Sequence, residues 1–300
     1  MVIRHGKRAT ESGAVLYSVV MPGLDPGIHV FVKVHRKKDV DGRNKSGHDD
    51  VDRAVRTILF ALVAFALILP ARAQTLPGGF VYLRDIDPTI LQDIRYATSN
   101  NFIGRPINGY QAGECIVKRE VGLRLKAVQQ ELAKRKLSLK VFDCYRPARA
   151  SLDMVKWSRD PRDSGHRFNP AIDKRDLFRL GYIASYSQHS TGAALDLTLV
   201  DLAADNSATF DPAKIYADCT APVEKRAPEG SIDMGTGYDC TDLKGHTRSS
   251  AITPEQRRWR EVLIAAMARQ GFVNYSKEWW HFSLPGAGGV AYDFPITARR

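Results

Sequence analysis

The sequence predicts an α+β fold, in which one domain holds a small, largely antiparallel sheet flanked by helices. Helix and strand patterns alternate irregularly, which favours this class over a regular succession of strand and helix units. From Leu76 to about Phe294 the composition is that of a globular protein, without internal repeats or a linker. We therefore expect one domain of about 220 residues.

Three segments carry helix signals. Residues 117–136 place Val and Leu side chains at spacings of three and four, which is the pattern of an amphipathic helix. Residues 147–157 start with a proline, which favours the first turn of a helix. A third helix is expected at about 254–270, because Thr253 begins a capping-box spacing and Gly271 follows the last periodic residue.

Strand signals occur in four segments, residues 137–142, 194–199, 272–275 and 279–284. The first alternates apolar and more polar side chains. In the second, three leucines take one face while Asp196 and Thr198 take the other. The last two segments are short and are separated by a turn.

The segment 53–73 has the features of a secretory signal. The apolar run 57–70 follows two arginines, and an Ala-Arg-Ala cleavage site ends at Ala73. A membrane anchor is the alternative, but the run is shorter than the roughly 20 apolar residues that cross a bilayer. We expect export to the periplasm, cleavage near Ala73 and no stable membrane insertion afterwards.

Residues 1–52 lie where a signal peptide would normally begin the protein. They are polar and rich in turn residues, and they resemble translated repeat DNA ahead of misassigned bacterial start codons. We expect this extension to be non-native or unstructured, and the functional chain to span residues 74–300. A mature protein that starts before Arg53 would contradict this expectation.

The positive charge gives little support for nucleic-acid binding. The formal charge is +11, but residues 1–73 hold 12 Lys and Arg and 7 Asp and Glu, which leaves +6 for the remainder. No run of basic residues with interleaved aromatic residues occurs there. We therefore expect no nucleic-acid partner.

All four cysteines follow the expected cleavage site, and their even number in an oxidising compartment favours disulfides. Among the three possible connectivities, we favour Cys115 with Cys144 and Cys219 with Cys240, because each bond then closes a local segment. Four buried free thiols are the alternative. A count of four reactive thiols in denatured, unreduced protein would support it.

Two motifs place metal-binding side chains on strand faces. His189 lies in a glycine-containing turn, and Asp196 follows on the polar face of the next strand. Near the other end, Glu278 precedes a strand on which His281 points away from the core. If the two strands are neighbours, the two histidines and Asp196 converge beside Glu278.

Two histidines and one carboxylate form a zinc set that leaves a fourth position for water, as catalytic sites require. Zinc lowers the pKa of water to about 7, and Glu278 is placed to accept its proton and pass it to the leaving amine. Arg146 could stabilise the oxyanion that forms. Each motif alone could arise by chance, and a surface salt bridge is the alternative for Arg146.

Residues 80–296 resemble the D-alanyl-D-alanine dipeptidases, the family that includes the vancomycin-resistance dipeptidase. The resemblance rests on ordered motifs: Ile94-Arg95-Tyr96-Ala97-Thr98 with Asn101-Phe102, Asp143-Cys144-Tyr145-Arg146-Pro147, Gly181-Tyr182-Ile183, Ser187-Gln188-His189-Ser190-Thr191-Gly192, Asp196-Leu197-Thr198-Leu199, Asp233-Met234-Gly235-Thr236 and Glu278-Trp279-Trp280-His281. It implies one zinc ion (Zn2+) per chain and these roles: ligands His189, Asp196 and His281; general base and acid Glu278; oxyanion stabiliser Arg146; substrate contacts Tyr96, Ser187 and Asp239.

One residue departs from the family pattern, because Thr191 stands where many relatives have arginine; this puts substrate preference in doubt. The resemblance implies zinc-dependent hydrolysis of D-Ala-D-Ala, a small D,D-dipeptide, to two D-alanines in cell-wall peptide turnover or recycling. The alternatives are a D,D-carboxypeptidase or endopeptidase on larger muropeptides and a non-catalytic, zinc-stabilised cell-wall binding module. The sequence leaves the oligomeric state open.

Overall fold

The computed structural model describes residues 15–19, 30–34, 75–162 and 167–299, and the chain divides into two units, Met1–Ala71 and Arg72–Arg300. In the first unit, β1 (Val15–Val19) and β2 (Val30–Val34) pair antiparallel, in a stretch where the sequence analysis named no strand. The signal segment 53–73 and most of residues 1–52 lie outside the described residues, so the expectations for them remain predictions. No described helix has the length and apolarity needed to cross a membrane.

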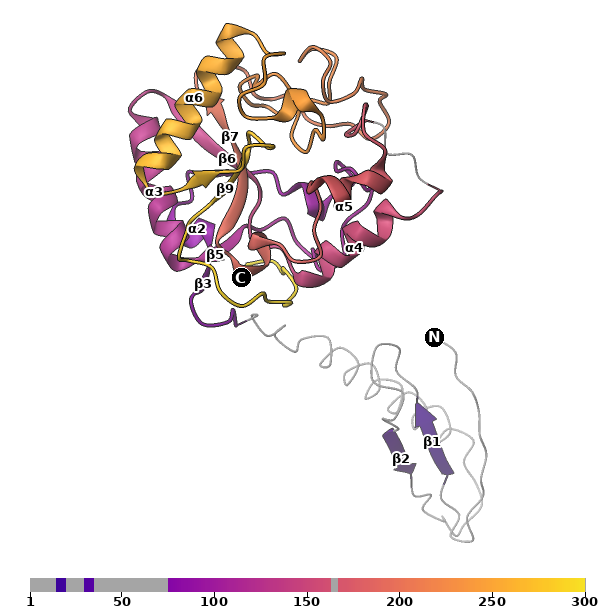
Figure 1. Ribbon diagram of the computed structural model, residues 1–300. Coiled ribbons are helices and arrows are strands. Elements are labelled where there is room, and N and C mark those ends of the chain that lie inside the picture. Colours follow the sequence, from indigo (N-terminus) through magenta and orange to yellow (C-terminus); the bar gives the residue numbers. More distant parts are fainter. Residues whose placement is uncertain (1–14, 20–29, 35–74, 163–166, 300) are drawn as a thin grey trace, which may run out of the picture. The chain divides into compact units, whose positions relative to one another are not determined.

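A five-stranded sheet forms the centre of the second unit (Figure 1). Only its outermost pair, β4 with β6, is parallel, while the other neighbours are antiparallel. This confirms the predicted α+β class. In spatial order the strands are β4 (Leu91–Gln92), β6 (Leu137–Asp143), β7 (Ala194–Asp201), β9 (His281–Ser283) and β8 (Val273–Asn274). A separate antiparallel pair joins β3 (Phe80–Tyr82) to β5 (Ile116–Lys118).

Helices lie on both sides of the central strands in Figure 1, with α3 and α6 together on one side and α4 and α5 on the other. The helix expected from residue 117 begins at Arg119, because the preceding residues pair with β3 instead. The α-helices are α2 (Leu83–Ile86), α3 (Arg119–Ala133), α4 (Ala148–Ser158), α5 (Leu177–Leu180) and α6 (Pro254–Arg269). The 3-10 helices are η1 (Arg95–Ala97), η2 (Lys174–Asp176), η3 (Gln188–Thr191) and η4 (Leu243–Gly245).

The capping box predicted for α6 is present. The Thr253 hydroxyl accepts a hydrogen bond from the Gln256 amide at 3.2 Å, and the Gln256 side chain accepts one from the Thr253 amide at 2.9 Å. At the other end Gly271 has φ of 82°, in the left-handed region that favours glycine. Local sequence therefore sets both ends of this helix.

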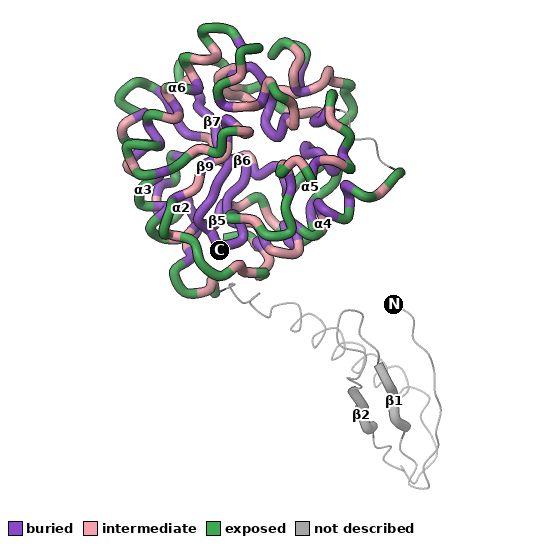
Figure 2. The backbone as a smooth tube through the Cα atoms, in the orientation of Figure 1, coloured by how far each residue is buried: buried purple, intermediate pink, exposed green. Residues whose placement is uncertain are grey.

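The predicted alternation of faces is seen in the burial of β9 but not in that of β6 or β7, in which almost every residue is buried (Figure 2). On β9, Phe282 is buried while its neighbours His281 and Ser283 are partly exposed. The polar face of β7, however, is also buried, with Asp196 only 2% exposed. Residues of the loop 202–253 contribute to this burial, since the Tyr238 hydroxyl donates to the Asp196 carboxylate at 2.9 Å. The central strand is thus enclosed on both faces.

Both predicted disulfides are confirmed. Cys115 bonds to Cys144, and Cys219 bonds to Cys240. The first joins β5 to the end of β6, and the second closes part of the loop between β7 and α6. All four cysteines are therefore paired.

Candidate active site

Three acidic or basic side chains meet at one end of the sheet because of strand register. Asp196 on β7 pairs directly with His281 on β9 and, on its other side, with Asp143 at the end of β6. A register shift between Val141 and Asp143 brings the latter residue into this row. The predicted adjacency of the two motif-bearing strands is therefore correct.

His189 reaches the same place from η3, the short helix that precedes β7. Ser187 caps η3 by accepting a hydrogen bond from the His189 amide at 3.2 Å. The helix ends at Gly192, which has φ of 78° and would bring any Cβ into collision with the Phe80 ring. Glycine is thus required for the turn that delivers His189 to the sheet.

The side chains of His189, Asp196 and His281 present a set of atoms that could hold one metal ion, and these atoms lie within 4.8 Å of one another. The His189 Nε2 atom is 3.1 Å from Nδ1 of His281, which is 3.0 Å from Oδ1 of Asp196. The Nδ1 atom of His189 lies 2.7 Å from the carbonyl oxygen of Cys144. A proton on that Nδ1 leaves the Nε2 lone pair directed at the cluster, which is the tautomer that a metal ligand needs.

The two histidines stabilise the negative charge of the Asp196 carboxylate, because they lie beside it. Burial alone would raise the pKa of Asp196, but His189 and His281 lower it below the usual range of an aspartate. On the other carboxylate oxygen, Asp196 accepts a hydrogen bond of 2.9 Å from the hydroxyl of Tyr238. The carboxylate is therefore held ionised and oriented, as metal coordination requires.

Glu278 lies three residues before His281, with its carboxylate 3.8 Å from the His281 Nδ1. Burial and then the negative charge of Asp196 raise the pKa of Glu278 to about 8. A carboxyl group with such a pKa can both take up and release a proton near neutral pH. This is the property expected of a general base that later acts as an acid.

Arg146 is not at the surface, because its side chain is only 12% exposed. Its guanidinium donates to the buried carboxylate of Asp143 at 2.9 Å and lies 3.7 Å from Asp196. Asp143 also accepts a hydrogen bond of 2.6 Å from the Tyr110 hydroxyl. The Arg146 side chain is thus fixed beside the candidate metal ligands by an internal ion pair, rather than by the surface salt bridge considered above.

Asp239 and Tyr96 form a second polar group in the same cavity. The Tyr96 hydroxyl donates to the Asp239 carboxylate at 2.9 Å, although the residues are 143 positions apart. Burial, followed by the charge of Asp196, raises the pKa of Asp239 well above its usual range. A carboxylate in this environment favours a cationic partner.

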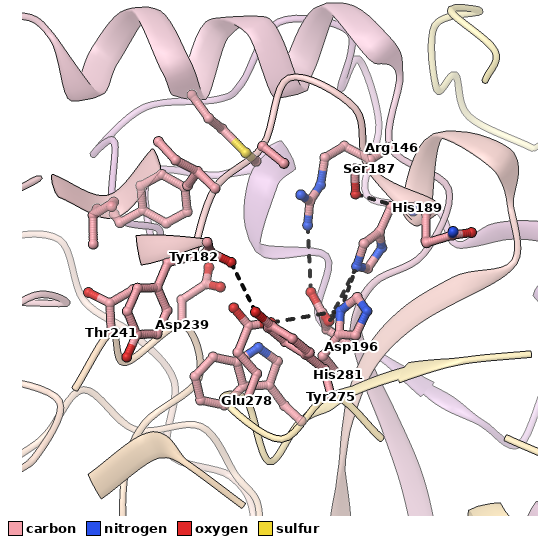
Figure 3. A pocket seen from close by; sticks show the side chains of 18 of the residues that line it. Arg146, Tyr182, Ser187, His189, Asp196, Asp239, Thr241, Tyr275, Glu278 and His281 are labelled. Atoms are coloured by element: carbon pink, nitrogen blue, oxygen red, sulfur yellow. Dashed lines mark hydrogen bonds and ion pairs between the residues drawn. The ribbon is translucent and has the colours of Figure 1, made fainter. Parts of the chain in front are cut away.

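One cavity of about 260 Å³ joins these groups. Figure 3 shows the side chains of Arg146, His189, Asp196, Glu278 and His281 directed toward one another. All eight residues assigned a role from the sequence line it: Tyr96, Arg146, Ser187, His189, Asp196, Asp239, Glu278 and His281. Their clustering does not test the individual roles, which remain proposals. Apolar side chains, among them Met154, Phe168 and Leu177, also line the cavity.

Sequence reasoning missed three polar residues at this site. Tyr238 and Tyr110 hold the carboxylates of Asp196 and Asp143, and no local pattern marks either tyrosine. Asn169 also lines the cavity, and its buried Oδ1 has no hydrogen-bond partner within the described part of the chain. The position of Tyr238 next to Asp239 was the one signal that could have found it. Thr191, the residue that departs from the family pattern, donates to the Gln188 carbonyl at 2.7 Å and accepts from the Ala193 amide at 3.3 Å, and so stabilises the end of η3.

The family model for D-Ala-D-Ala dipeptidases matches residues 77–212 and 220–299. The D-alanyl-D-alanine dipeptidase of Enterococcus faecalis is 30% identical over 209 residues, covering 69% of this chain and 92% of that protein. The D-alanyl-D-alanine dipeptidase of Streptomyces coelicolor is 30% identical over 224 residues, covering 73% of this chain and 99% of that protein. The D-alanyl-D-alanine dipeptidase of Escherichia coli is 28% identical over 222 residues, covering 73% of this chain and 89% of that protein.

Proposed function

This chain belongs to the D-Ala-D-Ala dipeptidase family, a family of metallopeptidases, and from that premise we propose that it hydrolyses D-alanyl-D-alanine to two D-alanines with one zinc ion per chain. The observation that carries the proposal is the convergence of His189, Asp196 and His281 beside Glu278 in one cavity. These residues come from three separate elements. A structural site would instead have a fourth protein ligand.

The donor set fits zinc. Two imidazole nitrogens and one carboxylate oxygen are the ligand types that zinc prefers, and they leave room for a further ligand. The hydrogen bond from His189 to the Cys144 carbonyl and that from Tyr238 to Asp196 orient the donors. When bound, the zinc ion supplies Lewis acidity and activates water for attack on the amide.

The side chains of this protein then account for the remaining chemistry. Glu278 accepts the proton of the attacking water and returns it to the nitrogen of the leaving D-alanine. Arg146, fixed by Asp143, places positive charge where negative charge develops on the carbonyl oxygen. Asp239 takes the free ammonium group of the dipeptide, and its bond to Tyr96 holds it toward the cavity.

The size of the cavity supports a dipeptide over a larger muropeptide. A volume of about 260 Å³ is below the 300 to 1,000 Å³ that is typical, as a rough range, of sites for drug-sized ligands. The test is the ratio of kcat/KM for D-Ala-D-Ala to that for a stem pentapeptide, measured with residues 74–300. A higher value for the pentapeptide would favour the carboxypeptidase or endopeptidase alternative.

Glu278→Gln separates catalysis from binding. Because Glu278 is assigned no ligand role, we expect the variant to keep one zinc ion while kcat falls by at least about 100-fold. Glu261→Gln, an exposed change on α6, is the matched control and should keep full activity. Unchanged properties of Glu278→Gln, together with no turnover by the wild type, would favour the non-catalytic binding module.

We also propose that the protein acts in the periplasm, in turnover or recycling of cell-wall peptides. The apolar run followed by an Ala-Arg-Ala site supports export, and the two disulfides suit an oxidising compartment. Cell fractionation and N-terminal sequencing test this proposal. A cytoplasmic product that retains residues 53–73 would refute it.

A further inference from the structure

The loop between β7 and α6, residues 202–253, carries a residue that must be placed accurately. Its only regular element is η4, so no sheet or long helix fixes its course. Asp239 nevertheless projects from this loop into the cavity, where it accepts the hydrogen bond of Tyr96. Side chains on irregular loops are less well positioned than those on strands, unless further contacts hold them.

The backbone at Asp239 needs such contacts. Its φ of 59° lies in the left-handed region, which residues with a side chain adopt less readily than glycine. Strained conformations of this kind persist only when the surrounding structure enforces them. The residues on both sides of Asp239 must therefore be restrained.

The preceding residue, Tyr238, is restrained independently of any disulfide. Its ring stacks on Phe142 with centroids 4.6 Å apart, and its amide donates to the Glu229 side chain at 2.9 Å. Its hydroxyl bonds to Asp196. These contacts hold Tyr238 against Phe142 on β6 and against the proposed metal ligand Asp196.

The following residue is Cys240, which bonds to Cys219 and is fully buried. The carbonyl of Cys219 accepts a hydrogen bond from the Gly237 amide at 2.9 Å. Cys219 is therefore bonded to the chain both before and after Asp239. The amide of Cys219 donates to the carbonyl of Arg167, and that of Thr241 donates to the carbonyl of Phe168. The disulfide and the Thr241 bond thus together join the chain that follows Asp239 to residues 167–168, and Phe168 lines the cavity.

We propose that the Cys219–Cys240 disulfide is a positioning element for substrate recognition, which holds Asp239 in the orientation that receives the free ammonium group of the dipeptide. The inference rests on the proposed function and deepens it. It places the effect of the disulfide on substrate binding rather than on the metal, because Tyr238 keeps its own contacts to the sheet and to Asp196. Loss of the disulfide should then raise KM and leave zinc content and kcat nearly unchanged.

The experiment is a double-mutant cycle between the disulfide and Asp239. The Cys219→Ala/Cys240→Ala protein should show KM for D-Ala-D-Ala raised by about tenfold or more, on the scale expected for a misplaced binding group. In an Asp239→Asn background, the same pair of changes should alter KM by less than about twofold, because the group that the disulfide positions is already neutral. One zinc ion per chain in all four proteins establishes that the cluster is intact.

An unchanged KM in the Cys219→Ala/Cys240→Ala protein would overturn the proposal. So would a rise of KM in the Asp239→Asn background as large as that in the wild-type background, because it would indicate that loss of the disulfide loosens the whole loop. If the double cysteine variant does not fold, a phosphine reductant is applied to the folded wild type, where it takes the oxygen of one water and leaves two thiols. Peptide mapping then reports the fraction of Cys219–Cys240 that is reduced, and an unchanged KM in that material also refutes the proposal. Absence of D-Ala-D-Ala hydrolysis by the wild type would refute the proposed function instead.

Discussion

Removal of the Tyr238 hydroxyl tests whether buried contacts orient the proposed zinc ligands His189, Asp196 and His281. In Tyr238→Phe the ring is kept, and with it the stacking on Phe142 at 4.6 Å. What is lost is the hydrogen bond of 2.9 Å to Oδ2 of Asp196, in a place where Tyr238 is only 1% exposed. Burial raises the pKa of Tyr238 well above its usual range, so the hydroxyl is a neutral donor at every working pH.

The magnitude follows from the environment of that oxygen. A hydrogen bond to a charged group contributes about 1.5–3 kcal/mol. Arg146, whose guanidinium is 3.7 Å from the same Oδ2 atom, can compensate in part, so we take the lower end. Since about 1.4 kcal/mol corresponds to a tenfold change in an equilibrium constant, the Kd for zinc should rise about tenfold.

The assay is competition for zinc with a chelator of known affinity. Tyr216→Phe is a suitable control. The Tyr216 hydroxyl accepts a hydrogen bond from the Asp211 amide within the loop 202–253, and its removal should not change zinc binding. A zinc Kd within twofold of the wild-type value in Tyr238→Phe would show that this hydroxyl does not orient Asp196.

Three further predictions concern the metal, the turn and the charge of the cavity. His281→Ala removes one of the three proposed ligands and should release zinc and abolish turnover, as measured by metal analysis of the purified protein. Gly192→Ala adds a Cβ against the Phe80 ring at φ of 78°, and should destabilise the fold by at least about 2 kcal/mol in urea unfolding; a smaller loss would mean that the turn adjusts. Because burial raises the pKa of Asp239, the folded state disfavours its ionised form, and the cost grows as the pH rises above the unfolded value of about 4. Metal-free Asp239→Asn should therefore melt a few degrees above the metal-free wild type at pH 8, and at the same temperature as the wild type at pH 4. A lower melting temperature of the variant at pH 8 would contradict the raised pKa of Asp239.

The parts of the site that lie on strands were predictable from local sequence. Alternation alone indicates that Asp196 and His281 leave the apolar faces of their strands, and the glycine at 192 indicates the turn that follows His189. The E-x-x-H spacing places Glu278 near its histidine. What alternation cannot supply is register, because pairing of β7 with β9 depends on contacts between residues 85 positions apart, as Asp196 and His281 are.

The contributions of the loop 202–253 were not predictable in this way. Without the family resemblance, Asp239 would have been interpreted as an ordinary loop residue, since its role depends on a contact with Tyr96 across 143 positions. Tyr238 was missed for the same reason, although its hydroxyl holds a proposed zinc ligand. The burial of the polar face of β7 also depends on this loop, whose conformation is set by one disulfide and by side-chain contacts rather than by periodic sequence.

The balance of charge in the cavity gives a physical reason why its acids have unusual properties. Among the described residues that line it, Asp196, Asp239 and Glu278 carry carboxyl groups, whereas Arg146 is the one guanidinium. Burial makes uncompensated negative charge costly, which is why the pKa values of Asp239 and Glu278 are raised while that of Asp196, beside two histidines, is lowered. A divalent cation at the histidines and an ammonium group at Asp239 would each offset one part of this excess, and a proton taken up by Glu278 during hydrolysis would offset another. The excess of negative charge is therefore consistent with the three proposed roles, namely metal binding at Asp196, binding of the substrate ammonium group at Asp239 and proton transfer at Glu278, and each role can be removed by changing one residue.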